Sequence, residues 1–168
     1  MENILKNRRS IRKFQPRQVT DQDLDAVLEA GLYAPSGMNT QTTVLVAVRE
    51  PQVRNQLSRM NAKVLGSSAD PFYGAPCVVV VLADPERYTW LEDGSLVMGN
   101  LMNAAYAQGL GSCWIHRAQP MFDSPEGKAL LRQWGLSENL KGVGNCILGY
   151  PDETPEAKPR LPGRILKV

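Results

Sequence analysis

The amino-acid sequence predicts a mixed α/β (α+β) fold in which a mixed central sheet is flanked by helices. Apolar stretches of strand length alternate with stretches of helical periodicity, although the alternation is irregular. Residues 77–83 form a continuous apolar run of the kind found in strands buried on both faces. Residues 90–108 form the longest helical segment. The chain has 168 residues, 43% hydrophobic and 21% charged, which suits one globular domain spanning 1–168.

The first half of the chain carries signals for three helices and one strand. Residues 2–7 are expected to form a short helix. A second helix is expected to begin after Thr20, which can cap its first turn, and to end before Pro35. Residues 43–48 predict a strand, and Pro51 is expected to open the third helix.

The second half is dominated by the helix predicted over 90–108. It is unusually rich in Gly, Ala and Ser, and small side chains let another backbone approach closely. We therefore expect a central helix that is packed on all sides or forms the seam of a dimer. Gly109 suits its C-terminal cap. Two further strands are expected at 112–116 and 143–149, and Ser124 is expected to begin another helix.

Several familiar kinds of chemistry are not supported. The cysteines Cys77, Cys113 and Cys146 form no CxxC pair and lie in apolar stretches, which is typical of reduced core residues. The glycine-rich stretch 109–114 precedes a strand rather than opening a helix, so it does not predict a dinucleotide-binding loop. His116 is the only histidine, and without a GxSxG motif it does not indicate a hydrolase.

Positive charge is concentrated at the two ends of the chain. Residues 6–17 carry six cations without an acid, and residues 157–168 carry four, which together make ten of the nineteen Lys and Arg residues. Two distant basic segments can converge on one anion, although two solvated basic tails give the same pattern. Few aromatic residues interleave the first segment, so a nucleic-acid-binding domain is not favoured.

Three short segments carry the most specific chemistry. Residues 8–12 combine guanidinium donors, a hydroxyl and positive charge, which suits a phosphate group. Residues 34–41 form a turn of amides and hydroxyls that can meet the polar edge of a planar heterocycle, although an ordinary helix-to-strand loop would look similar. Residues 148–152 and 158–162 contain prolines that hold the C-terminal cations in an extended geometry.

Taken in this order, the segments resemble those of the FMN-dependent nitroreductase family, and the length of the chain suits a small member of it. The resemblance rests on RRSIRKF, the APSGMNTQ turn, the YGAP-to-VVVV passage, DGSLVMGNLMNAAYAQGLGSCWI and ILGYPDETPEAKPRLP. It covers nearly the whole chain, and the ordered set is more specific than any single piece. It implies a homodimer with the long helix at its interface and two FMN molecules, each contacted by both subunits.

The resemblance also implies which residues bind the cofactor. The N-terminal set, for the phosphate, the ribityl chain and the pyrimidine edge, is Arg8, Arg9, Ser10 and Arg12. The turn that reaches the ring from the partner subunit supplies Pro35, Ser36, Gly37 and Asn39. The stretch whose backbone lies over the ring, with an amide near flavin N5, is Trp114, Ile115 and His116. The C-terminal basic pair on the phosphate is Lys158 and Arg160.

The function implied is FMN-dependent, NAD(P)H-linked two-electron reduction of a small oxidant, such as a nitroaromatic or a quinone, by a ping-pong mechanism without a catalytic side chain. Reductive dehalogenation, flavin destruction and a redox-sensing module without turnover are the alternatives. Thr42 and Thr43 replace the Pro-Trp common in the family, so the resemblance does not define how the residues after the turn pack. The sequence shows neither a secretory signal at its start nor a membrane-spanning run, so a cytoplasmic location is expected.

Overall fold

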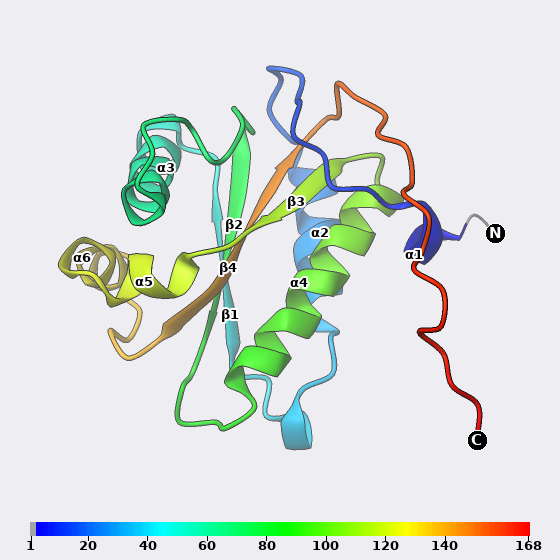
Figure 1. The fold of residues 1–168 in the computed structure, drawn as a ribbon. Helices are drawn as coiled ribbons and strands as arrows, with labels where there is room; N and C mark the ends of the chain where they lie inside the picture. The colour runs from blue at the N-terminus through cyan, green and yellow to red at the C-terminus, as the bar shows by residue number, and fades with distance from the viewer. Residues whose placement is uncertain (1–2) are drawn as a thin grey trace.

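The computed structural model describes residues 3–168 and places a four-stranded sheet between two layers of helices (Figure 1). The strands lie in the order β1-β2-β4-β3, and every neighbouring pair is antiparallel. Their bounds are β1 (Thr43–Val48), β2 (Cys77–Ala83), β3 (Gly111–Ile115) and β4 (Lys141–Gly149). A single parallel bridge joins Ser10 to Ser112 at the β3 edge.

Helices cover both faces of this sheet. One face carries α3 (Pro51–Leu65), α5 (Ala118–Asp123) and α6 (Pro125–Gln133), and the other carries α2 (Asp21–Leu32) and α4 (Trp90–Ala107) (Figure 1). The short helix α1 (Ile4–Asn7) and the 3-10 turn η1 (Gly37–Asn39) lie outside these layers. The predicted α+β class, a sheet flanked by helices, is confirmed.

Strand β2 lies in the interior because all seven of its residues are apolar and buried. Alternate side chains of a strand point to opposite faces. Val78 and Val80 therefore join the core beneath α3 and α5, whereas Val79 and Val81 join the core beneath α2 and α4. Two hydrophobic cores share the sheet, and they fix the positions of the loops at its ends.

Most element boundaries follow the local signals in the sequence. Thr20 caps α2 by accepting a hydrogen bond from the Asp23 amide at 3.2 Å, and Ser124 caps α6 by accepting one from the Gly127 amide at 3.1 Å. Gly109 adopts φ +72° just after α4, which is the left-handed conformation that glycine accommodates without steric cost.

Several boundaries differ from the predictions, and one helix was not predicted. The first helix begins at Ile4, and Glu2 of the predicted range lies outside the described residues. β3 ends at Ile115, which leaves His116 in the following loop, and β4 begins earlier, at Lys141. The six-residue helix α5 was not predicted, because a helix this short shows little periodicity.

The N-terminal and C-terminal segments pair with each other at one end of the molecule. The Gln15 amide donates to the Tyr150 carbonyl at 2.9 Å, and the Asp152 amide donates to the Lys13 carbonyl at 2.9 Å. Glu153 Oε1 accepts from the amides of Arg12 and Lys13. The basic N-terminal segment is therefore paired with residues 150–153, which precede the C-terminal basic segment.

The cysteine thiols are core groups. Cys77, Cys113 and Cys146 are buried and free. Burial raises the pKa of Cys77 to about 12, and burial likewise raises the pKa of Cys146. Because the thiolate is the reactive form, the Cys77 and Cys146 thiols are inert at neutral pH. No helix among residues 3–168 has both the length and the apolar character needed to cross a bilayer.

Asp70 fixes the loop that follows α3. Its carboxylate accepts hydrogen bonds from Arg54 Nη2 at 2.7 Å and Ser58 Oγ at 2.6 Å, both on α3, and from the amides of Phe72 and Gly74. Burial acts to raise the pKa of Asp70, but the bonds from Arg54, Ser58 and the two amides outweigh it, so the pKa is lowered.

We expect Asp70→Asn to destabilise the protein by about 1–2 kcal/mol at pH 7, because Arg54 loses its charged partner in a partly buried site. A lowered pKa in the folded state makes this contribution present above the unfolded pKa and lost as the pH falls through the folded value. Denaturant unfolding at pH 7 and at pH 3 measures both stabilities. The difference between wild type and variant should shrink at pH 3, and an equal difference at both values would contradict this account.

Candidate functional site

The N-terminal segment contains cationic donors that are buried without partners. Arg8 is half-buried, and its Nη1 atom has no hydrogen-bond partner within the described chain. Arg9 donates from Nη1 to the carbonyls of Lys6 and Arg8, both at 2.7 Å, while its Nε atom is buried and unpaired. Leaving charged donors unsatisfied away from water is costly. An anion in contact with them would remove that cost.

The side chains of this segment point alternately to two sides. The bridge at Ser10 and the hydrogen bond from the Ile11 amide to the Ser112 carbonyl, at 3.0 Å, make the segment extended. In extended chain, neighbouring side chains alternate. Arg9 and Ile11 therefore share one side, and Arg12 lies on the other, where its guanidinium is 5.8 Å from the centre of the Tyr73 ring.

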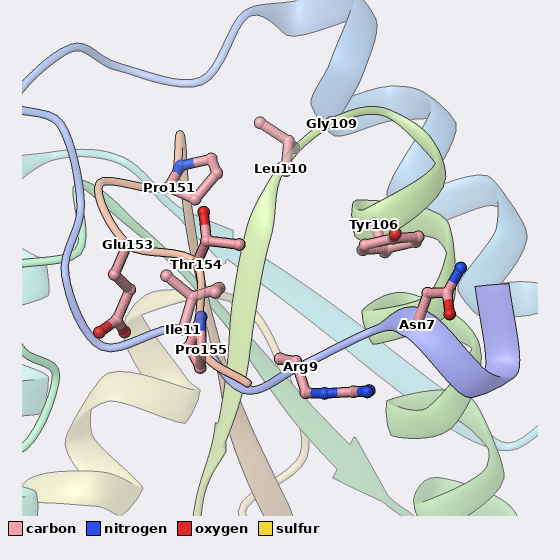
Figure 2. A pocket seen from close by; sticks show the side chains of 10 residues that line it. All are labelled: Asn7, Arg9, Ile11, Tyr106, Gly109, Leu110, Pro151, Glu153, Thr154 and Pro155. Atoms are coloured by element: carbon pink, nitrogen blue, oxygen red, sulfur yellow. The ribbon is translucent and has the colours of Figure 1, made fainter. Parts of the chain in front are cut away.

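A cavity of about 370 Å³ lies between the two ends of the chain (Figure 2). Figure 2 shows the N-terminal segment on one side of it, the end of α4 on another and the segment after β4 on a third. The residues that line it are Asn7, Arg9, Ile11, Tyr106, Gly109, Leu110, Pro151, Glu153, Thr154 and Pro155. Arg9 is the one cation among these lining residues, and Glu153 is an acid.

The C-terminal cations do not line this cavity. Lys158 and Arg160 are exposed, and Arg160 Nη2 donates to the Lys158 carbonyl at 2.8 Å. They line instead a depression formed by residues 158–165 of their own segment. In the single chain, neither Arg8 nor the pair Lys158 and Arg160 joins Arg9 around this cavity.

The predicted turn after α2 is held by a residue that the sequence analysis missed. Asp93, buried in the first turn of α4, accepts a hydrogen bond from the Gly37 amide at 2.9 Å and another from Thr89 Oγ1 at 3.1 Å. A Cβ atom at Gly37 would lie 2.5 Å from Thr89 Oγ1. Glycine is therefore required for the turn to approach α4 this closely.

The same turn is conformationally strained and protrudes from the molecule. Met38, Asn39 and Gln41 all have φ between 51° and 55°, a left-handed conformation that costs a non-glycine residue about 1 kcal/mol or more. The Met38 side chain is 97% exposed. The hydroxyls of Thr40 and Thr42 are buried and unpaired in the described chain. Strain of this kind is characteristic of functional segments.

The turn and the N-terminal cations lie at opposite ends of α4. Gly37 is bonded to Asp93 at the start of this helix, whereas Arg9 shares its cavity with Tyr106 near the helix end. Thirteen residues at 1.5 Å each separate these two positions by about 20 Å. Figure 1 shows the same separation, with η1 at the bottom and the N-terminal segment at the top. One chain alone does not bring Pro35, Ser36, Gly37 and Asn39 to Arg8.

The third predicted stretch, residues 114–116, has side chains in both hydrophobic cores of the sheet. The Trp114 ring packs on the α4 side, against Gly144 of β4, and Ile115 is buried on the α3 side. His116 has an exposed side chain, but its carbonyl accepts a hydrogen bond from Asn61 Nδ2 at 2.7 Å. Asn61 and Asp93 were missed because an isolated Asn or Asp inside a helical pattern gives no local signal of burial.

Comparison with known proteins identifies relatives along nearly the whole chain. The family model described as Nitroreductase family matches residues 5–68 and 63–150. A protein of Archaeoglobus fulgidus, provisionally named NADH dehydrogenase/NAD(P)H nitroreductase, is 34% identical over 164 residues, which span 91% of this chain and 88% of that protein. The NADPH-flavin oxidoreductase of Vibrio harveyi is 29% identical and matches 99% of this chain and 71% of its own length.

Solved structures agree with these sequence relatives. The crystal structure of a nitroreductase with bound FMN from Bacteroides fragilis matches with a TM-score of 0.90 and 31% identity, and the match covers 100% of both chains. An FMN-dependent nitroreductase from Clostridium difficile R20291 matches with a TM-score of 0.82 and 29% identity, over 100% of this chain and 98% of that one.

Proposed function

Because this chain belongs to the nitroreductase family, we propose that it is an FMN-dependent NAD(P)H oxidoreductase that reduces small acceptors such as nitroaromatics or quinones. FMN, when bound, would supply the redox chemistry, taking a hydride from NAD(P)H and passing two electrons to the acceptor in a ping-pong sequence. The protein would supply binding, orientation and electrostatic stabilisation. Since NAD(P)H is an intracellular reductant, the proposal places this activity in the cytoplasm.

One structural observation supports the cofactor most strongly: the two unpaired, buried donors Arg8 Nη1 and Arg9 Nε. A phosphate monoester carries about 1.5 to 2 negative charges at neutral pH and three acceptor oxygens, and guanidinium groups bind such groups through charge-assisted hydrogen bonds. The Ser112 hydroxyl, also buried and unpaired, lies opposite Ser10 at the isolated bridge. Each of these donors therefore has the chemistry that the phosphate end of FMN requires.

Arg12 is the proposed group for the polar edge of the flavin. Its guanidinium lies on the side opposite Arg9, and it has no ion-pair partner among the described residues. A fixed cation near the pyrimidine edge would stabilise negative charge that develops on the ring system during reduction. The guanidinium makes a cation–π contact with Tyr73, in the loop held by Asp70.

We propose that the complete site needs a second copy of the chain. The turn of residues 35–39 would contact the flavin held by Arg8 of the partner, since the two regions of one chain lie about 20 Å apart along α4. Exposed apolar side chains near this turn, including Tyr33, Met38 and Leu96, are suited to a subunit interface. Lys158 and Arg160, solvated in the single chain, would then approach the phosphate within the dimer.

The proposal predicts that the purified protein binds close to one FMN per chain and that NADH or NADPH bleaches the bound flavin under anaerobic conditions. Gel filtration followed by absorbance measures the ratio, and anaerobic titration with each nicotinamide measures reduction. Adding a nitroaromatic or a quinone should restore the oxidised spectrum. A protein that takes up no FMN would contradict the cofactor assignment. One that binds FMN but is not reduced would be a redox-sensing module without turnover.

A further inference from the structure

The turn between β3 and α5 is held by a buried amide on a different element. Asn61, on α3, has no exposed surface. Its Nδ2 atom donates to the His116 carbonyl at 2.7 Å and lies 3.2 Å from Met121 Sδ, while its Oδ1 atom accepts from Arg117 Nε at 3.0 Å. Asn61 thus contacts the main chain of His116 and the side chain of Arg117, the first two residues of the turn.

The conformation that Asn61 holds is unfavourable by itself. Arg117 has φ +76° and ψ 11°, a left-handed conformation that costs a residue with a Cβ atom about 1–2 kcal/mol. Such a residue persists only where its surroundings fix it. The contacts from Asn61 to the His116 carbonyl and to the Arg117 side chain supply part of that constraint, together with the hydrogen bond from the Met121 amide to the Arg117 carbonyl at 3.2 Å.

Holding the His116 carbonyl also fixes the direction of the neighbouring amide. The peptide bond is trans, as are all peptide bonds in the described chain, so its C=O and N–H point in opposite directions. Because the carbonyl points to Asn61 on α3, the Arg117 N–H points away from α3. The resemblance leads us to expect the backbone of Trp114, Ile115 and His116 over the flavin ring, and we include this position in the functional proposal; the His116–Arg117 peptide directly follows it.

We propose that Asn61 is a positioning residue that orients the His116–Arg117 peptide so that the Arg117 N–H faces the bound flavin. This inference rests on the proposed function. It predicts that loss of Asn61 leaves FMN binding largely intact, because the phosphate donors Arg8 and Arg9 lie elsewhere, but slows hydride transfer at saturating nicotinamide.

The test uses Asn61→Leu, which keeps the branching at Cγ and removes both hydrogen bonds, in the full-length protein loaded with FMN. We expect the rate constant for flavin reduction to fall at least tenfold, while the dissociation constant for the nicotinamide changes less than threefold. A second readout does not depend on turnover. The ¹⁵N–¹H amide resonance of Arg117 should shift when FMN is added to the wild-type apoprotein and should shift much less in the variant.

Leu57→Ala provides the matched control, because Leu57 is equally buried on α3 and touches the core rather than the turn. It should lower thermal stability, yet leave the reduction rate and the Arg117 amide shift unchanged. If Asn61→Leu does not fold, Asn61→Asp takes its place, since it keeps the Oδ1 acceptor and the shape but lacks the Nδ2 donor.

The outcomes separate this inference from the functional proposal. A wild-type protein that binds no FMN or is not reduced would overturn the proposed function. With a reducible wild type, an Asn61 variant that is reduced at the wild-type rate, or that shows the full Arg117 shift, would overturn the positioning role. A folded variant that no longer holds FMN would overturn it as well, because Asn61 would then act in cofactor binding.

Discussion

Replacing Arg8 by alanine is expected to raise the dissociation constant for FMN about 5- to 150-fold, which corresponds to about 1–3 kcal/mol. The Arg8 guanidinium is half-buried and its Nη1 atom lacks a partner in the described chain. A charge-assisted hydrogen bond formed there is less screened by water and salt than one at the surface. Fluorescence titration of the apoprotein with FMN measures the change.

Two further variants make this result interpretable. Arg160→Ala is expected to weaken FMN binding too, but less than Arg8→Ala, because Arg160 is exposed and hydrogen-bonded within its own segment. Arg59→Ala removes an exposed charge from α3 and should leave the affinity unchanged. Equal losses for Arg8 and Arg59 would mean that only the net charge matters, and an unaltered affinity for Arg160→Ala would remove that residue from the site.

Local signals predicted the regular elements well because those elements depend on nearby residues. The cap at Thr20 and the apolar run at 77–83 each determine their own segment, and the structure places α2 and β2 there. The helix α5 was not predicted, because six residues are too few to show a helical period of apolar side chains. The antiparallel pairing of β2 with β4 joins residues more than fifty positions apart, and no local pattern specifies such a contact.

The candidate site was predictable only where its residues lie close together in the sequence. The cations at 8–12 and the turn at 35–39 each stand out as a cluster. Asn61 and Asp93 are single polar residues inside helices, and each one acts on a loop more than fifty positions away from it. Only the folded structure shows that their amide and carboxylate groups are buried and directed at those loops.

Substituting Gly99 by arginine is expected to abolish most FMN binding by preventing dimer formation. A Cβ atom at this α4 position meets nothing within 4 Å in the single chain, and arginine favours helix over glycine by about 0.5–1 kcal/mol. The subunit itself should therefore be no less stable. A long charged side chain here would clash with a second copy packed on this face of α4. Sedimentation analysis and the FMN content measure the two effects.

Ala129→Arg is the control, because it places the same side chain on an exposed position of α6, on the other face of the sheet. It should leave both the dimeric state, measured by sedimentation, and the FMN content per chain unchanged. A Gly99→Arg protein that remains dimeric, or one that is monomeric and still holds one FMN per chain, would contradict a shared site.

Mixed dimers test the sharing directly. If Arg8 and Asn39 of one site come from different chains, a dimer of one Arg8→Ala chain and one Asn39→Ala chain has both changes in one site and neither change in the other. Such a dimer should bind one FMN with wild-type affinity, although each parent dimer binds weakly at both sites. If one chain supplied both residues, each site of the mixed dimer would carry one defect and no wild-type site would appear. The 20 Å that separate the two regions along α4 favour the first result.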